Sequence, residues 1–306
     1  MKQFLKKISL YILIPSFFGL MLFYLSGAYI TFDLIDNQID KSVKHIIIGD
    51  SHINQAFDER FLPESKNIAT TSESIYFSYY KLKAVLDKHS SIENVFLGLS
   101  YHNISNYYDR FISGRFSAST APKYFYLLPA DEKMKHLYWN SSKTVPFLKG
   151  IAKQGMYKSL AKRTDSFLGG FSNEFERSTV SESLMDRRLV FQFYTEKKLN
   201  PFSELNIDYL SKIVELCDEK NVELYAVNTP LHTYYHNRIP QVYVEKLNEL
   251  IEKHQLNYID FSTLNLSDSC FTPDGDHVSV LGAKRTSTEL KKQIFKVKNR
   301  LIINTP

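Results

Sequence analysis

After residue 42 the chain alternates between short apolar runs and longer amphipathic stretches. The apolar runs predict strands at His45–Ile48, Asn94–Leu97, Val222–Val227 and Asn257–Ile259, with a weaker one near Asn67–Ala69. Apolar residues at helical spacing predict helices at Ser74–His89, Phe202–Glu219, Val242–His254 and from about Val280 to the end. Strands that alternate with helices favour an α/β fold whose parallel sheet is covered on both faces.

The alternation lapses between about residues 104 and 200, where Tyr, Phe, Ser and Lys are frequent. This segment holds the single tryptophan, Trp139, and the pair Gly169-Gly170. We expect a mostly helical insertion over the functional edge of the sheet. Its aromatic residues could stack on sugar rings or pack a small core of the insertion itself.

The N-terminal segment predicts a membrane span. Ile8–Ile30 carries no charge and would measure about 35 Å as a helix, enough to cross a bilayer core of about 30 Å. Lys2, Lys6 and Lys7 precede it, and the next lysine is Lys41. This asymmetry predicts a cytoplasmic tail (1–7), an anchor (8–30), a linker (31–41) and an extracytoplasmic domain (42–306), periplasmic or on the cell surface.

A cleaved signal peptide is the alternative, since Ser26-Gly27-Ala28 fits a small-x-small cleavage site. The apolar run is longer than a usual signal core, which favours the anchor.

Composition excludes some classes of function. The formal net charge is only +5 over 306 residues, and the basic residues are scattered among acidic ones, so nucleic acid is not an expected partner. Cys217 and Cys270 form no CxxC motif, which argues against a zinc knuckle or a redox motif. The two cysteines could form a disulfide if the domain lies outside the cytoplasm.

Candidate chemistry appears where the first predicted strand ends. Gly49, Asp50, Ser51 and His52 follow His45–Ile48 directly. An ordinary strand-to-helix turn would use the glycine for its backbone angle and Asp or Ser as a helix cap. Ligands of parallel α/β sheets, however, bind at the carboxyl ends of the strands, and this position favours a functional interpretation.

A second polar cluster, Asp274, Asp276 and His277, lies in a loop before the last predicted helix. A calcium loop would need a closing glutamate, which the sequence lacks. A metal site could join His277 to Asp50 and His52, but no clear ligand spacing supports one.

Nucleophilic catalysis uses these residues best. A serine hydroxyl needs a histidine base, and the base needs a carboxylate that fixes its tautomer. Ser51, His277 and Asp274 supply the three parts, with Asp276 as the rival carboxylate, and we expect neither a metal nor a cofactor.

The two clusters together resemble the SGNH/GDSL hydrolase superfamily. The match covers roughly residues 42–103 and 203–298. The resemblance implies a flavodoxin-like three-layer fold and ester chemistry, with Ser51 as nucleophile, His277 as base and Asp274 as the orienting acid. More narrowly, "IIIGDSH", "NTPLHTYY" and "DGDHVSVLGA" resemble membrane-attached SGNH-like proteins of cell-envelope polysaccharide O-acetylation.

The sequence departs from the family where an oxyanion hole is expected. His52 replaces a leucine, and "NIATTSES" offers no glycine, so the backbone of Thr71 or Ser72 would have to donate. Ser100 stands where an asparagine is expected, and Asn103 follows three residues later. His102 and Asn103 are therefore candidate replacement donors, or they simply cap the chain there. One such donor contributes about 3–4 kcal/mol, so missing donors would mean a slow enzyme, an acyl-carrier step or an inactive protein.

We therefore expect serine-dependent acyl-ester chemistry, by an esterase or O-acyltransferase, on a cell-surface glycan. Transfer would require an integral membrane acyltransferase as donor, because the chain shows no acyl-donor motif of its own. The alternatives are a catalytically silent glycan-binding or scaffold protein and a purely structural partner of such an acyltransferase.

Overall fold

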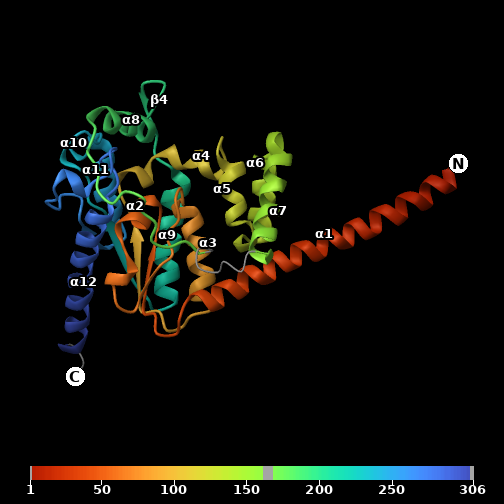
Figure 1. Cartoon of the computed structure of the whole chain (residues 1–306), viewed down its shortest axis with the longest axis horizontal. Helices are drawn as coiled ribbons and strands as arrows, with labels where there is room; N and C mark the ends of the chain where they lie inside the picture. The colour runs from red at the N-terminus through yellow and green to blue at the C-terminus, as the bar shows by residue number, and fades with distance from the viewer. Residues whose placement is uncertain (1, 161–167, 304–306) are drawn as a thin grey trace.

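The core of the protein is a five-stranded parallel sheet in the order β2-β1-β3-β6-β7. A computed structural model (Figure 1) describes residues 2–160 and 168–303. The strands are β1 (His45–Ile48), β2 (Ser65–Asn67), β3 (Asn94–Gly98), β6 (Glu223–Asn228) and β7 (Asn257–Asp260). Residues 161–167 of the predicted insertion and 304–306 of the predicted domain lie outside the described residues, as does Met1 of the predicted tail.

Helices cover both faces of the sheet. α3 (Ile75–Leu86) and α9 (Glu204–Glu219) pack together on one face, and α11 (Gln241–Lys253) contributes Leu247 and Leu250 to the same core. α2 (Ser51–Ala56) and α12 (Val280–Ile303) pack together on the other face. This confirms the expected α/β fold, a flavodoxin-like three-layer sandwich.

The predicted elements agree with the observed ones to within a few residues, except at β2. We expected this strand at Asn67–Ala69, but it spans Ser65–Asn67. The backbone N–H groups of Ile68 and Thr70 still bond to carbonyls of the β1 segment. The side chain of Asn67, however, accepts a hydrogen bond from the backbone of Ala69 at 2.9 Å, and this local bond ends the regular strand.

The insertion between β3 and α9 is mostly helical, as expected. Its elements are η2 (Tyr101–Ile104), η3 (Asn106–Tyr108), α4 (Asp109–Ile112), α5 (Ser117–Thr120), η4 (Ala121–Lys123), η5 (Phe125–Leu127), α6 (Ala130–Trp139), η6 (Ser141–Lys143), α7 (Thr144–Leu160) and α8 (Glu182–Phe193). A short antiparallel hairpin of β4 (Tyr194–Thr195) and β5 (Lys198–Leu199) follows. Many of its aromatic residues are buried; Tyr107, Tyr108 and Phe111 form a small cluster of their own.

The N-terminal helix α1 (Lys2–Gln38) is one continuous element, and its N-terminal part projects from the body in Figure 1. It is long and apolar enough to cross a membrane. The segment 31–41, which we expected to be a linker, is helical through Gln38. Ile35 and Ile39 are almost fully buried in the main core, so the end of this helix is part of the domain's packing.

Candidate active site

The turn from β1 into α2 presents Ser51 at the carboxyl edge of the sheet. Gly49 has a φ of +150°, a conformation that favours glycine, and a side chain there would also crowd Gly98 of β3. Asp50 caps α2, accepting a hydrogen bond from the backbone N–H of His52 at 2.9 Å. Ser51 is therefore the first helical residue and is only 8% exposed.

The structure brings Ser51, His277 and Asp274 together. Ser51 Oγ lies 2.9 Å from His277 Nε2, and His277 Nδ1 lies 3.0 Å from Asp274 Oδ2. Ser51 and His277 are 226 positions apart in the chain, so only the fold creates this contact. Although burial opposes ionisation, the adjacent His277 holds the pKa of Asp274 below its ordinary value.

The loop that carries His277 is fixed on several sides. Thr272 donates its hydroxyl to Asp274 at 2.5 Å, and the backbone N–H of Ser181, just before α8, donates to the carbonyl of Pro273 at 2.9 Å. Gly275 has a φ of +63°, and a side chain there would collide with Met185 of α8. The N-terminal half of α8 thus closes over this loop and positions the imidazole.

A second set of charges lies directly beside these three residues. His52 contacts Asp50 through Nδ1 at 3.2 Å and Asp276 through Nε2 at 2.8 Å. Its ring stacks on that of His277, with centroids 4.4 Å apart and an angle of 15° between the planes. Burial opposes the charge of His52, but the carboxylates of Asp276 and Asp50 outweigh it and raise its pKa to about 10. His52 is therefore an imidazolium at neutral pH.

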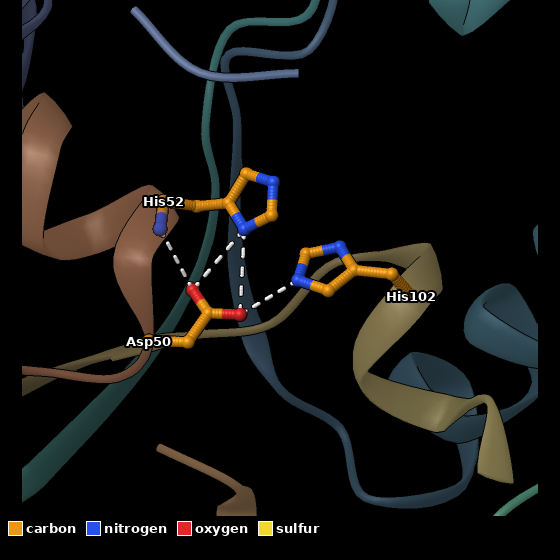
Figure 2. Close-up of side chains that lie close together, drawn as sticks. All are labelled: Asp50, His52 and His102. Atoms are coloured by element: carbon orange, nitrogen blue, oxygen red, sulfur yellow. Dashed lines mark hydrogen bonds and ion pairs between the residues drawn. The ribbon is translucent and has the colours of Figure 1, made fainter. Parts of the chain in front are cut away.

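Asp50 contacts two imidazoles, one charged and one neutral. Figure 2 shows its carboxylate between His52 and His102, whose Nε2 lies 2.6 Å from Asp50 Oδ2. Burial and the nearby His52 cation lower the pKa of His102 to about 4, against the pull of Asp50. A neutral His102 therefore donates its Nε2–H to Asp50. Tyr108 and Asn103 also donate to this carboxylate, the latter at 3.1 Å.

Asp276 does not act as the carboxylate of His277. Besides His52, its partners are Arg188 at 2.5 Å and Gln192 at 2.9 Å, both from α8. His52 and Arg188 overcome the effect of burial and hold the pKa of Asp276 well below its ordinary value. The roles of Arg188 and Gln192 were not foreseen, because both lie in the irregular insertion, where the sequence carries no motif.

The two candidate oxyanion residues occupy different surroundings. Asn103 accepts from the backbone N–H of Ser100 at 2.7 Å, and its amide group donates to Asp50, so both ends of its side chain are engaged. Ser72 is half-buried in the loop after β2 and has a φ of +64°. Their role as oxyanion donors stays a prediction.

A buried ion pair fixes the loop that holds Ser72. Lys81 of α3 pairs with Glu73 and donates to the carbonyls of Ile68 at 2.6 Å and Leu168 at 2.9 Å. Burial lowers the pKa of Lys81 and raises that of Glu73. Both groups are buried, and Lys81 binds Glu73 and two backbone carbonyls at once. These bonds hold the loop between β2 and α3 in one conformation.

Among the described residues, two overlapping groups of side chains have donor atoms close enough to hold a metal ion: Asp50, His52 and His102, and His52, Asp276 and His277. The two ring nitrogens of His52 contact Asp50 and Asp276, and His102 Nε2 contacts Asp50. Cys217 on α9 and Cys270 on η7 (Asp268–Cys270) are both buried and free.

No protein-family model matches the chain, and no curated protein matches it. The chain is similar to a solved structure from Bacteroides fragilis NCTC 9343 described as a "putative acylhydrolase". The sequence identity is 10% and the TM-score 0.38, over 83% of this chain and 87% of that chain. So loose a likeness carries no functional argument, and the function is argued from the site itself.

The charged state of His52 and the neutral state of His102 can be measured. In the full-length protein with ¹⁵N-labelled histidine rings, we expect His52 to give imidazolium shifts and His102 neutral shifts between about pH 6 and 9. The pKa of folded His52, about 10, lies above its ordinary value of 6.5. Its charge therefore stabilises the fold fully below about pH 6.5, and this contribution is lost as the pH rises through about 10.

The variants His52→Gln and His102→Gln assign the two signals. If the signal lost in His52→Gln belongs to a ring that releases its proton near pH 6.5 in the unmodified protein, the ion-paired interpretation of this cluster is wrong.

Proposed function

We propose that this protein is an SGNH-type acyl-ester enzyme in which Ser51 is the nucleophile, His277 the general base and Asp274 the orienting carboxylate. The observation that carries the proposal is the relay Ser51–His277–Asp274, with its two contacts of 2.9 and 3.0 Å. Both lie within the hydrogen-bond reach that such a proton relay requires.

Proton transfer follows from this geometry. His277 Nε2 accepts the proton of Ser51 Oγ as the oxygen attacks an ester carbonyl, and the resulting imidazolium keeps its Nδ1–H on Asp274. The acyl group is transferred to Ser51, and the alkoxide of the leaving alcohol takes the proton from His277. Water, or a second hydroxyl group, then attacks the acyl-serine with the same base.

Donors for the oxyanion are proposed from the loop after β2. One N–H of the Asn103 amide already donates to Asp50, and we propose the backbone N–H of Thr71 or Ser72 as the donor on this side of the nucleophile. Lys81 and Glu73 hold the loop by buried bonds, and fixed donors are what stabilisation of a developing negative charge requires.

We propose a surface glycan as the substrate. A groove of about 770 Å³ is lined by Asn54 of α2, one turn after Ser51, and by Thr70 and Thr71 of the loop after β2. Its other walls include Lys66, Arg60 and Phe171, and the Arg60 guanidinium lies 5.9 Å from the centre of the Phe171 ring. A partly exposed aromatic ring among hydrogen-bonding and charged groups suits a polar sugar chain.

Transfer between two hydroxyl groups is favoured over hydrolysis. Ser51 and His277 are each only 8% exposed, and an acyl-serine in such a site would be poorly accessible to water. An acyl donor would have to come from elsewhere, and an integral membrane acyltransferase is the proposed partner.

We propose that α1 anchors the chain in a membrane with the domain outside the cytoplasm. The lysines at positions 2, 6 and 7 flank only the N-terminal end of the apolar segment, which supports this orientation. A reporter fused after Pro306 should then be active only outside the cytoplasm. A cytoplasmic reporter would overturn the orientation.

A second candidate is a catalytically silent glycan-binding or scaffold protein. The amide of Asn103 favours it, since one of its two N–H groups is already held by Asp50. The two candidates differ in whether Ser51 matters for chemistry.

Hydrolysis of p-nitrophenyl acetate by the full-length protein in detergent tests the relay. We expect Ser51→Ala and His277→Ala to lower the rate by about 10⁴-fold or to the buffer rate, and Asp274→Asn by about 10³–10⁴-fold. Asp268→Asn is the matched control, because this carboxylate on η7 is 71% exposed and contacts His232 rather than His277. Equal rates in Ser51→Ala and the unmodified protein would refute the relay.

The glycan of a Ser51→Ala strain distinguishes the proposed functions. Under transfer, we expect one class of O-acyl ester signals to disappear from its NMR spectrum. A gain of ester signals would identify an esterase instead. If the glycan is unchanged in the Ser51→Ala strain but altered in a strain that lacks the gene, the result would support the scaffold function.

A further inference from the structure

α6 and α7 expose an unusual set of apolar side chains. Met134 and Tyr138 of α6 are 65% and 78% exposed, and Val145, Leu148 and Met156 of α7 are 62%, 47% and 51% exposed. We call these five residues the α6–α7 platform. Large apolar side chains that are exposed on two consecutive helices suit a surface that contacts another apolar phase.

α7 is apolar on its buried face and along one flank. Phe147, Ile151 and Gly155 are buried against the body. Val145, Leu148 and Met156 recur at the spacing of i, i+3 and i+11 and lie along a flank between the buried residues and the exposed Lys149 and Lys153. A flank that faced only solvent would carry polar residues at these positions.

The length of α1 indicates that the exposed apolar side chains of α7 face the membrane. Its apolar residues from Ile8 to Leu22 are exposed, and this stretch measures only about 22 Å. A bilayer core is about 30 Å thick, so the membrane must extend about five residues further, to the neighbourhood of Gly27. Tilting α1 would lengthen this requirement, because a tilted helix crosses less thickness per residue.

That part of α1 is where the body docks. Tyr126, at η5, packs against Gly27, and Phe23 of α1 packs against Gly155 of α7. In Figure 1, α7 crosses α1 and lies between the sheet and the projecting part of that helix. The C-terminal part of α7 thus sits at the depth where the hydrocarbon core ends.

The charges around the platform fit an anionic surface. Residues 133–156 contain five lysines and no acidic residue. Lys149 and Lys153 are exposed on α7, and the ammonium group of Lys133 lies 5.4 Å from the centre of the Tyr24 ring on α1. Lysines beside apolar and aromatic side chains are typical of the region between lipid head groups and acyl chains.

We propose that the α6–α7 platform rests in the outer leaflet of the bilayer, with its apolar side chains among the acyl chains and its lysines at anionic head groups. This inference rests on the proposed membrane anchoring by α1 but not on the catalytic role of Ser51. The occupant of the platform is lipid, and the domain is held against the membrane rather than on a stalk above it.

Single-cysteine variants labelled with the environment-sensitive dye NBD test the proposal in full-length protein reconstituted in nanodiscs. The two native cysteines are buried, so labelling is directed to the introduced site. The platform probe is Leu148→Cys, with Val145→Cys as a second probe. Val190→Cys on α8, 57% exposed, is the matched control away from the membrane, and Leu20→Cys on α1, 70% exposed, reports on the anchor itself.

We expect a blue-shifted emission at the two platform probes, quenching by phospholipids that carry a nitroxide on the acyl chain, and protection from iodide. At Val190 we expect the opposite pattern. Exchanging phosphatidylglycerol for phosphatidylcholine should weaken lipid quenching at the platform, as should the double variant Lys149→Gln/Lys153→Gln. Quenching at Leu20 should be unaffected.

Iodide quenching at Leu148 equal to that at Val190, with Leu20 still quenched by lipid, would overturn the platform and leave the anchor intact. Protection of Leu148 from both quenchers would also overturn it, because the occupant would then be protein. Loss of lipid quenching at Leu20 itself would instead remove the anchoring on which the inference rests.

Discussion

The site depends on one buried contact, the imidazolium of His52 held between Asp50 and Asp276. All three side chains are at most 3% exposed, so each charge is stable only while its partners are present. Removing one partner of such a buried pair typically costs about 3–5 kcal/mol, because the remaining charge has no solvent. The contact between His52 and Asp276 links the turn after β1 to the loop before α12. This link holds Ser51 beside His277.

The same cluster draws the insertion into the site. Asp276 is bound by Arg188 of α8, and Asp50 by His102 and Tyr108 near the end of β3. The carboxylates of Asp50, Asp274 and Asp276 stand against the cations of His52 and Arg188, which leaves one net negative charge beside His277. A proton moving from Ser51 to His277 would be favoured by that charge, and Asp274 is placed to hold the imidazolium it creates.

Much of the sheet could be predicted from the sequence, because strands buried on both faces are continuous apolar runs such as His45–Ile48. Ser51, Asp274 and His277 could be named because glycine turns and local spacing mark them, and the fold brings them together. Arg188 could not be named, since one of two adjacent arginines on a helix looks like any solvated residue until its partner Asp276 is known. The packing of the segment 31–41 could not be predicted for a related reason: Ile35 and Ile39 continue an apolar stretch, and only the folded structure shows that they enter the core.

Because α1 runs unbroken from its apolar span into the core, the body cannot rotate freely about a flexible joint. Gly27 permits the close approach of Tyr126, and Ile35 is fully buried, so about the last three turns of the helix are fixed to the domain. If α1 spans the membrane, the site is held at a constant height, which suits the proposed exchange of acyl groups with a neighbouring membrane protein. A long flexible linker would instead let the site reach glycan at varying distances, and the structure describes a helix where such a linker was expected.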